Sequence, residues 1–154
     1  MSSEEDVDIL FKGFSLTDDV AGKNSMINPI GIHIALRVRD LERAVDFYTS
    51  LFGLRVRGRG SSDDSPLVLL ERGALRLALI ESKTPEWEAG RGGLHHLGFL
   101  VGSTEEVIAI EAALRRRGIS ISRQAVNPRH PGERSIYFHD PDGHLIEVYY
   151  EAAR

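Results

Sequence analysis

Two histidines and one glutamate are the residues whose types and positions in this chain best suit metal chemistry. His33 and His96 lie 63 residues apart, each at the start of a segment in which apolar residues alternate. Glu147 lies in the apolar run 145–150, where a carboxylate is costly to bury unless it is paired or binds a metal. Two imidazoles and one carboxylate suit Fe(II) and also accept Mn, Co, Ni or Zn. The three residues therefore predict a divalent metal site, with Fe(II) as the expected ion.

Strand alternation places the two histidines on equivalent faces. In residues 31–38 the apolar side chains share one face and His33 lies on the other. In residues 96–101 His96 likewise lies opposite the apolar face. If the strands curl into a concave sheet, both rings point into one cavity, and Glu147 can point there as well.

Two neighbours of these ligands are candidates for contacts with a substrate. Arg37 shares the face of His33, so we expect it to bind an anionic group of the substrate. His95 directly precedes His96 and is expected either to be structural or to border the site beside that ligand.

The elements that must position these residues occur twice. Residues 30–82 predict a strand, a helix that begins after Asp40, and three further strands. Residues 94–151 repeat this order, with a helix that begins at a capping box on Ser103. The duplication predicts an α+β fold of two βαβββ modules, joined by a linker at residues 83–93.

Finer features follow from turn chemistry and polarity. Residues 58–66 are predicted to form a polar loop, and residues 119–122 a strand that precedes a loop at 125–133. Residues 135–150 predict a closing β-hairpin, with Asp-Pro-Asp-Gly at 140–143 as its turn.

Composition bounds the class of protein. The chain has 154 residues, a net charge of −4 and no cysteine, which excludes disulfides and gives no basic footprint for nucleic acid. No apolar run reaches the length of a membrane span. We expect a cytoplasmic protein with a single domain at residues 29–151, preceded by an acidic extension at residues 1–28.

Three stretches resemble the vicinal oxygen chelate superfamily, which includes glyoxalase I, extradiol dioxygenases, fosfomycin-resistance thiol transferases and bleomycin-binding proteins. They are residues 33–54, 93–99 and 137–147. The resemblance implies paired βαβββ modules that form a cupped mixed sheet around a divalent metal. It implies the ligands His33, His96 and Glu147, a small-molecule substrate and a homodimer.

Members of this superfamily differ at defined positions. Tyr137 stands where extradiol dioxygenases carry a tyrosine, ten residues before the metal glutamate, and His130 loosely matches their loop histidine. These two residues are the catalytic candidates, although a strict two-residue turn would place Tyr137 opposite Glu147, so that a bulge would be needed. The acid–base histidine of those enzymes has no counterpart in residues 67–94. Fosfomycin transferases share the Tyr-Phe-x-Asp-Pro-Asp-Gly-His run but have threonine where Ala35 stands.

A fourth metal ligand distinguishes glyoxalase I. Matching Gly143 to Gly73 puts Leu77 at the place that Glu147 occupies in the second module. Because leucine cannot bind a metal, a three-ligand site is predicted, with Glu81 as the open alternative.

Three functions remain after this comparison. The first is a dioxygenase-type metalloenzyme, in which Tyr137 serves a developing oxyanion and His130 or His95 transfers a proton. The second is a non-oxidative metalloenzyme that transfers a thiol or moves a proton on the same triad. The third is a metal-free module that binds a small molecule such as an antibiotic.

Overall fold

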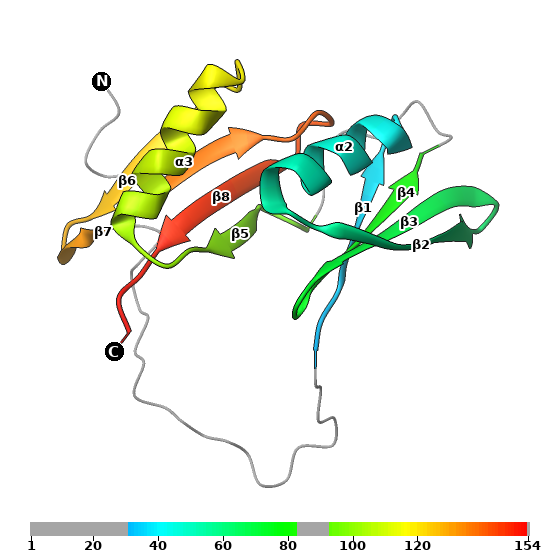
Figure 1. Ribbon diagram of the computed structural model, residues 1–154, viewed down its shortest axis with the longest axis horizontal. Coiled ribbons are helices and arrows are strands. Elements are labelled where there is room, and N and C mark those ends of the chain that lie inside the picture. The colour runs from blue at the N-terminus through cyan, green and yellow to red at the C-terminus, as the bar shows by residue number, and fades with distance from the viewer. Residues whose placement is uncertain (1–30, 83–92, 154) are drawn as a thin grey trace, which may run out of the picture.

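The computed structural model describes residues 31–82 and 93–153, which form two modules with the same order of elements (Figure 1). The first module contains β1 (Ile34–Val38), α2 (Leu41–Phe52), β2 (Arg55–Ser62), β3 (Ser65–Arg72) and β4 (Leu75–Glu81). The second contains β5 (Leu97–Leu100), α3 (Thr104–Arg116), β6 (Arg123–Asn127), β7 (His130–His139) and β8 (Leu145–Tyr150). The predicted extension at 1–28 and nearly all of the linker at 83–93 lie outside the described residues.

Each module forms one four-stranded mixed sheet. The strand orders are β1-β4-β3-β2 and β5-β8-β7-β6, with β1 parallel to β4 and β5 parallel to β8. The remaining strand pairs are antiparallel. The predicted α+β fold of two βαβββ modules is therefore confirmed. Within the chain the eight strands form two sheets side by side, not one continuous sheet.

Both helices begin and end where their capping residues predict. The Asp40 side chain accepts a hydrogen bond from the Arg43 backbone N–H at 2.9 Å, and α2 ends at Gly53 with a φ of 62°. The Ser103 hydroxyl accepts from the Glu106 N–H at 3.1 Å, and α3 gives way to Gly118 with a φ of 73°. The positive φ explains the glycine at both ends, because other residues are strained there.

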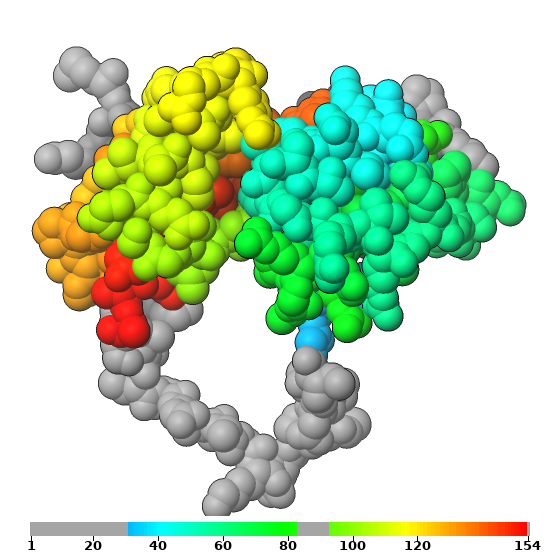
Figure 2. Space-filling model, in the orientation of Figure 1, coloured from blue at the N-terminus to red at the C-terminus, as the bar shows by residue number. Residues whose placement is uncertain are grey.

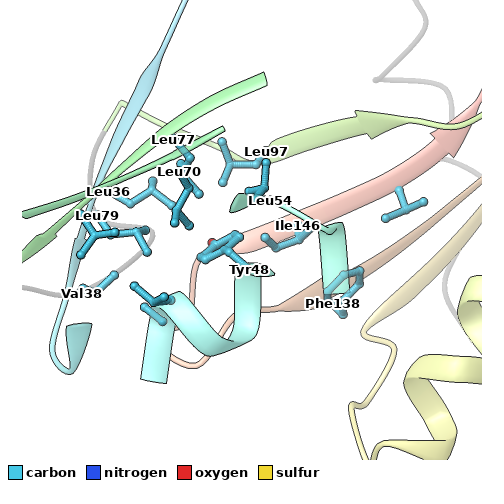
Figure 3. Packing of buried hydrophobic residues seen from close by; sticks show 14 of the residues in the cluster. Leu36, Val38, Tyr48, Leu54, Leu70, Leu77, Leu79, Leu97, Phe138 and Ile146 are labelled. Atoms are coloured by element: carbon cyan, nitrogen blue, oxygen red, sulfur yellow. The ribbon is translucent and has the colours of Figure 1, made fainter. Parts of the chain in front are cut away.

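The helices bury the apolar faces of both sheets in one shared core. α2 packs on β3 and β4, and α3 packs on β7 and β8; both helices face the viewer in Figure 2. Leu97 and Ile146 of the second module lie beside Leu54 and Tyr48 of the first (Figure 3). The two modules therefore fold as one packed unit.

The predicted loop at residues 58–66 is instead a β-hairpin. Its turn residues Asp63 and Asp64 have φ values of 49° and 61°, the left-handed pair that a two-residue hairpin turn requires. The glycines and polar residues of β2 are poor strand formers, but β3 is anchored by buried Val68 and Leu70, and β2 pairs with the backbone groups along its edge.

The predicted strand at residues 119–122 begins four residues before the observed strand β6. The N–H of Ile119 bonds to the Leu114 carbonyl at 3.0 Å and so completes the end of α3. β6 begins only at Arg123 and continues to Asn127, which shortens the predicted loop at 125–133 to a tight connection before β7.

The Asp-Pro-Asp-Gly turn joins the modules. The Tyr48 hydroxyl donates to the Asp140 carboxylate at 2.8 Å in a buried bond, and the Arg39 N–H donates to Asp142 at 2.9 Å. His144 Nε2 lies 2.9 Å from the Arg37 carbonyl oxygen. The turn thus fixes the β7–β8 hairpin against the corner between β1 and α2.

Neither helix of the described segments has the length and apolar content that a membrane span requires.

The bond from Tyr48 to Asp140 predicts a stability effect. Tyr48→Phe should lower the free energy of unfolding by about 1.5–3 kcal/mol, because a buried carboxylate loses a hydrogen bond. Urea denaturation measures this value. Tyr150→Phe is the control: its hydroxyl makes no hydrogen bond with the described residues, so the change should stay within about 0.5 kcal/mol. Equal effects of the two variants would contradict the role given to Asp140.

Candidate functional site

Strand register gathers a row of residues on the face of the second sheet that α3 does not cover. Gly98 pairs with Glu147, Glu147 with Tyr137, and Tyr137 with Arg123, one residue from each strand. Directly paired residues point to the same side of a sheet. The opposite face carries Ile136 and other buried core residues, so this row faces away from the core.

Two side chains converge on the two oxygens of Glu147. His96 Nε2 lies 3.0 Å from Oε2, and the Tyr137 hydroxyl donates to Oε1 at 2.5 Å. The Glu147 side chain is 14% exposed, which makes these contacts the main compensation for its lost hydration. The rings of His96 and Tyr137 meet edge to face with their centroids 6.0 Å apart.

His95 holds the other side of the His96 ring. The Nδ1 atoms of the two imidazoles lie 2.7 Å apart, so one ring donates a proton to the other. If His96 presents an unprotonated Nε2 to a metal, its Nδ1 carries the proton and His95 accepts it. This arrangement agrees with the expectation that His95 borders the site.

The pKa of Tyr137 is raised above its usual value. Burial is the main cause, and the hydrogen bond to Glu147 and its negative charge act in the same direction. The phenol therefore stays protonated at neutral pH and remains a hydrogen-bond donor.

The donor atoms of His96 and Glu147 fit a metal ion. Bonds of about 2.1 Å at right angles place two donor atoms about 3.0 Å apart, and the observed separation is 3.0 Å. His33, however, precedes β1 in the other module and is exposed. Across residues 31–82 and 93–153 no group of three His, Cys, Asp or Glu side chains could hold a metal ion. One chain thus brings together two of the three predicted ligands.

The other predicted residues lie apart from this pair. Arg37 is exposed on β1, in the first module with His33. His130 begins β7, seven residues from Tyr137 in the same strand. Tyr137 pairs with Arg123 and His130 with Asn127, four residues further along β6, so at about 3.3 Å per residue His130 lies about 13 Å along the sheet from Tyr137 and does not contact Glu147.

The face of Tyr137 is decided by the connection between β7 and β8. His139 pairs with Leu145, which leaves five connecting residues, and Tyr137 pairs directly with Glu147. The Gly143 N–H donates to the Asp140 carbonyl, the Asp140 N–H donates to the His144 carbonyl, and Gly143 has a φ of 92°, which is a turn with a glycine bulge. The expectation that a bulge at the turn is needed to bring both residues to one face is therefore confirmed. Beyond the turn, no register shift occurs between the paired residues of the two strands.

Sequence reasoning missed Arg123. Its guanidinium carbon lies 4.0 Å from the centroid of the Tyr137 ring. The signal was hidden because residues 119–122 were expected to form the strand, which left Arg123 beyond it. Only the register of β6 against β7 places the two residues together.

The first module lacks this chemistry. Ala35 pairs with Ala78 and Ala78 with Leu69, so Ala78 and not Leu77 occupies the place of Glu147. The alignment of Gly143 with Gly73 was therefore shifted by one residue, because the connections before β4 and β8 differ in length. Alanine offers no ligand either. Glu81 pairs with Val38, a core position, and so does not share the face of His33.

Comparisons with known proteins identify the family. The model of the Glyoxalase/Bleomycin resistance protein/Dioxygenase superfamily matches residues 32–148. The chain belongs to this superfamily. The resemblance inferred from the sequence is thereby confirmed.

Relatives within this superfamily have different activities. The chain is 31% identical to a trivalent organoarsenical cleaving enzyme of Bacillus sp. (strain MD1), over 77% of this chain and 71% of that one. It is 30% identical to a catechol-2,3-dioxygenase of Bacillus subtilis, over 77% of this chain and 40% of the relative. The fosfomycin resistance protein FosX of Listeria monocytogenes aligns with a TM-score of 0.65 at 26% identity, over 82% and 96% of the two chains. FosX has also been solved in complex with Mn(II).

The contact between Tyr137 and Glu147 predicts a titration effect. In protein treated with chelator, Glu147→Gln should lower the pKa of Tyr137 towards its usual value, because a negative neighbour is removed while burial remains. Ultraviolet absorbance of ionised tyrosine measures this shift. Comparison with Tyr137→Phe identifies which part of the absorbance change comes from Tyr137. An unchanged Tyr137 titration in Glu147→Gln would show that the carboxylate does not act on the phenol.

Proposed function

We propose that this protein is a divalent-metal-dependent enzyme of dioxygenase type, which acts on a small substrate that chelates the metal through two adjacent oxygens. The observation that carries the proposal is the convergence of His96 and Tyr137 on the Glu147 carboxylate. His33, His96 and Glu147 would hold the ion, which is expected to be Fe(II). The relationship to a catechol-2,3-dioxygenase supports this reaction class.

We further propose that His33 reaches the site from a second copy of the chain. The described residues of one chain provide only two close ligands. β1 and β5, which follow the two histidines, are edge strands of their sheets. Ile32 and Leu100 are 77% and 57% exposed beside these edges, and a dimer would cover such apolar side chains. A homodimer would then contain two complete sites.

The residues of the chain have distinct parts in the proposed reaction. A bound divalent ion would polarise the adjacent oxygens of the substrate. Tyr137, protonated at neutral pH, has a single O–H, which would turn from Glu147 to the oxyanion that develops on the substrate once a bound ion compensates the carboxylate. His95 would keep the His96 ring oriented through the contact between their Nδ1 atoms. His130 has no part in this scheme because of its distance along β7, and Arg37 stays a prediction.

A non-oxidative metalloenzyme is the second candidate. Residues 67–94 contain no histidine that could serve as the acid–base group expected of an extradiol dioxygenase. This absence favours chemistry that needs only metal polarisation, such as the transfer of a thiol or a proton. Cleavage of trivalent organoarsenicals is less favoured, because the chain has no cysteine to supply a soft ligand for arsenic.

Metal content tests the proposed function. Protein purified without oxygen or chelators should hold near-stoichiometric metal. Glu147→Gln and His96→Ala should each lower metal affinity by more than about 100-fold, because loss of a direct ligand exceeds the usual effect of its supporting residues. His130→Ala, a matched histidine control, should retain the metal. Metal content is measured by mass spectrometry.

The identity of the metal separates the candidates. Iron, together with oxygen uptake on addition of catechol, supports the dioxygenase. Manganese, nickel or zinc without oxygen uptake supports the non-oxidative enzyme. Absence of metal from the wild type, even after incubation with each ion, contradicts both.

Mixing two inactive variants tests the contribution of a second copy. His33→Ala and Glu147→Gln should each bind little metal alone. When they are unfolded together and refolded, a mixed dimer would contain one site with all three ligands. Random pairing should then restore about one quarter of the wild-type metal content. No restoration would place all three ligands in one chain.

A further inference from the structure

The face that carries the proposed metal ligands also carries one cation. Arg123 pairs with Tyr137 in the register of β6 and β7, and its guanidinium carbon lies 4.0 Å from the centroid of the Tyr137 ring. Paired residues point to the same side of a sheet, so the charge of Arg123 lies on the face of Glu147. The Tyr137 ring contacts the flat face of the guanidinium, so the N–H groups at the edge of the guanidinium can still donate hydrogen bonds.

The charge of Arg123 has no acidic partner among the described residues. Glu111, the acid near this end of the sheet, is bound to Arg115 at 3.0 Å and to Arg134 at 2.8 Å, on the side of α3. Glu147 is bound to His96 and Tyr137. A guanidinium that has no acidic partner among the described residues is suited to a planar oxyanion, which it can bind through two parallel hydrogen bonds.

The distance between Arg123 and the metal ligands is one that a compact molecule can span. Arg123 lies two strands from Glu147, a backbone separation of about 10 Å. Gly98, on the other side of Glu147, has no side chain to obstruct the approach. A Cβ atom there would lie 3.4 Å from Glu147 Oε2 and 3.2 Å from the Tyr149 ring. A compact ligand that spans about 10 Å would therefore contact both Glu147 and the exposed Arg123.

The first module shows that the fold does not require this arginine. In its equivalent row, Ala35, Ala78 and Leu69 are followed by Gly58 at the place of Arg123. The same architecture thus forms with no side chain at that position. Arg123 is better explained by what the second module binds than by what its sheet needs.

We propose that Arg123 binds an oxyanion substituent of the substrate. The substrate class is then a compact molecule with two adjacent oxygens at one end and a carboxylate or a similar oxyanion at the other. This inference rests on the proposed function for the chelating end only. The oxyanion would lie at Arg123 and not in the adjoining hollow, where Glu133, Glu147 and Glu151 outnumber the one cation Arg134, itself bound to Glu111.

Three simple probes separate the two ends of the ligand. Catechol has the adjacent oxygens alone, benzoate has the carboxylate alone, and 3,4-dihydroxybenzoate has both. Titration calorimetry without oxygen, on protein loaded with Mn(II), gives their dissociation constants. Wild type should bind 3,4-dihydroxybenzoate about 10–100 times more tightly than catechol, the factor expected for hydrogen bonds to a charged group.

Variants at Arg123 give the decisive comparison. Arg123→Gln should weaken the binding of 3,4-dihydroxybenzoate by about 10–100-fold and leave the dissociation constant of catechol within about threefold of the wild-type value. Arg123→Lys keeps the charge but lacks the planar guanidinium, so its affinity for 3,4-dihydroxybenzoate should lie between those of the wild type and Arg123→Gln. Arg116→Gln, an exposed arginine at the end of α3, is the matched control and should change neither affinity.

The outcomes distinguish this inference from the proposed function. Equal affinities for 3,4-dihydroxybenzoate in wild type and Arg123→Gln, with catechol binding retained, would overturn the role of Arg123 and leave the metal site standing. Failure of catechol to bind, with benzoate binding that depends on Arg123, would overturn the chelating site and support the oxyanion site. Failure of benzoate and 3,4-dihydroxybenzoate alike would overturn the role of Arg123.

Discussion

The Glu147 carboxylate is the constraint on which the candidate site depends. It lies in a strand whose neighbouring residues Ile146 and Val148 are buried in the core, and its own side chain is 14% exposed. A carboxylate in such a position needs compensation for lost hydration, and here His96 and Tyr137 provide it, one at each oxygen. The same two contacts leave an imidazole nitrogen and a carboxylate at a separation that one metal ion can bridge.

The fold holds this carboxylate in place through contacts of the turn at the end of the β7–β8 hairpin. The turn at residues 140–144 is fixed to the first module by the bonds from Tyr48 to Asp140 and from Arg39 to Asp142. Because the turn sets the pairing of β7 with β8, it also sets Tyr137 opposite Glu147. The first module thus supports the site through packing and hydrogen bonds. Its own row of Ala35, Ala78 and Leu69 contains no side chain that could bind a metal or transfer a proton.

Local signals in the sequence were sufficient for the modules and for part of the site. The caps at Asp40 and Ser103 begin their helices as predicted, and strand alternation correctly placed His96 on the face of Glu147. These features depend on residues close in sequence, whose preferences act locally.

Features that depend on pairing between distant strands could not be predicted in the same way. Tyr137 shares a face with Glu147 because of the length of the connection, and Arg123 joins them because β6 begins later than its apolar residues suggested. The polar residues of β2 form a strand only because β3 offers an edge to pair with. The described residues of one chain do not bring His33 to His96 and Glu147, and alternation within a strand does not specify how the two histidines lie relative to each other.

Anomalous diffraction from crystals loaded with Mn(II) tests the central claim most directly. We expect one strong peak per chain, bonded to His96 Nε2 and a Glu147 oxygen, with His33 of a second copy as the third protein ligand. A peak at other residues, or no peak at Glu147 in fully loaded crystals, would contradict the claim that this carboxylate is the centre of a metal site.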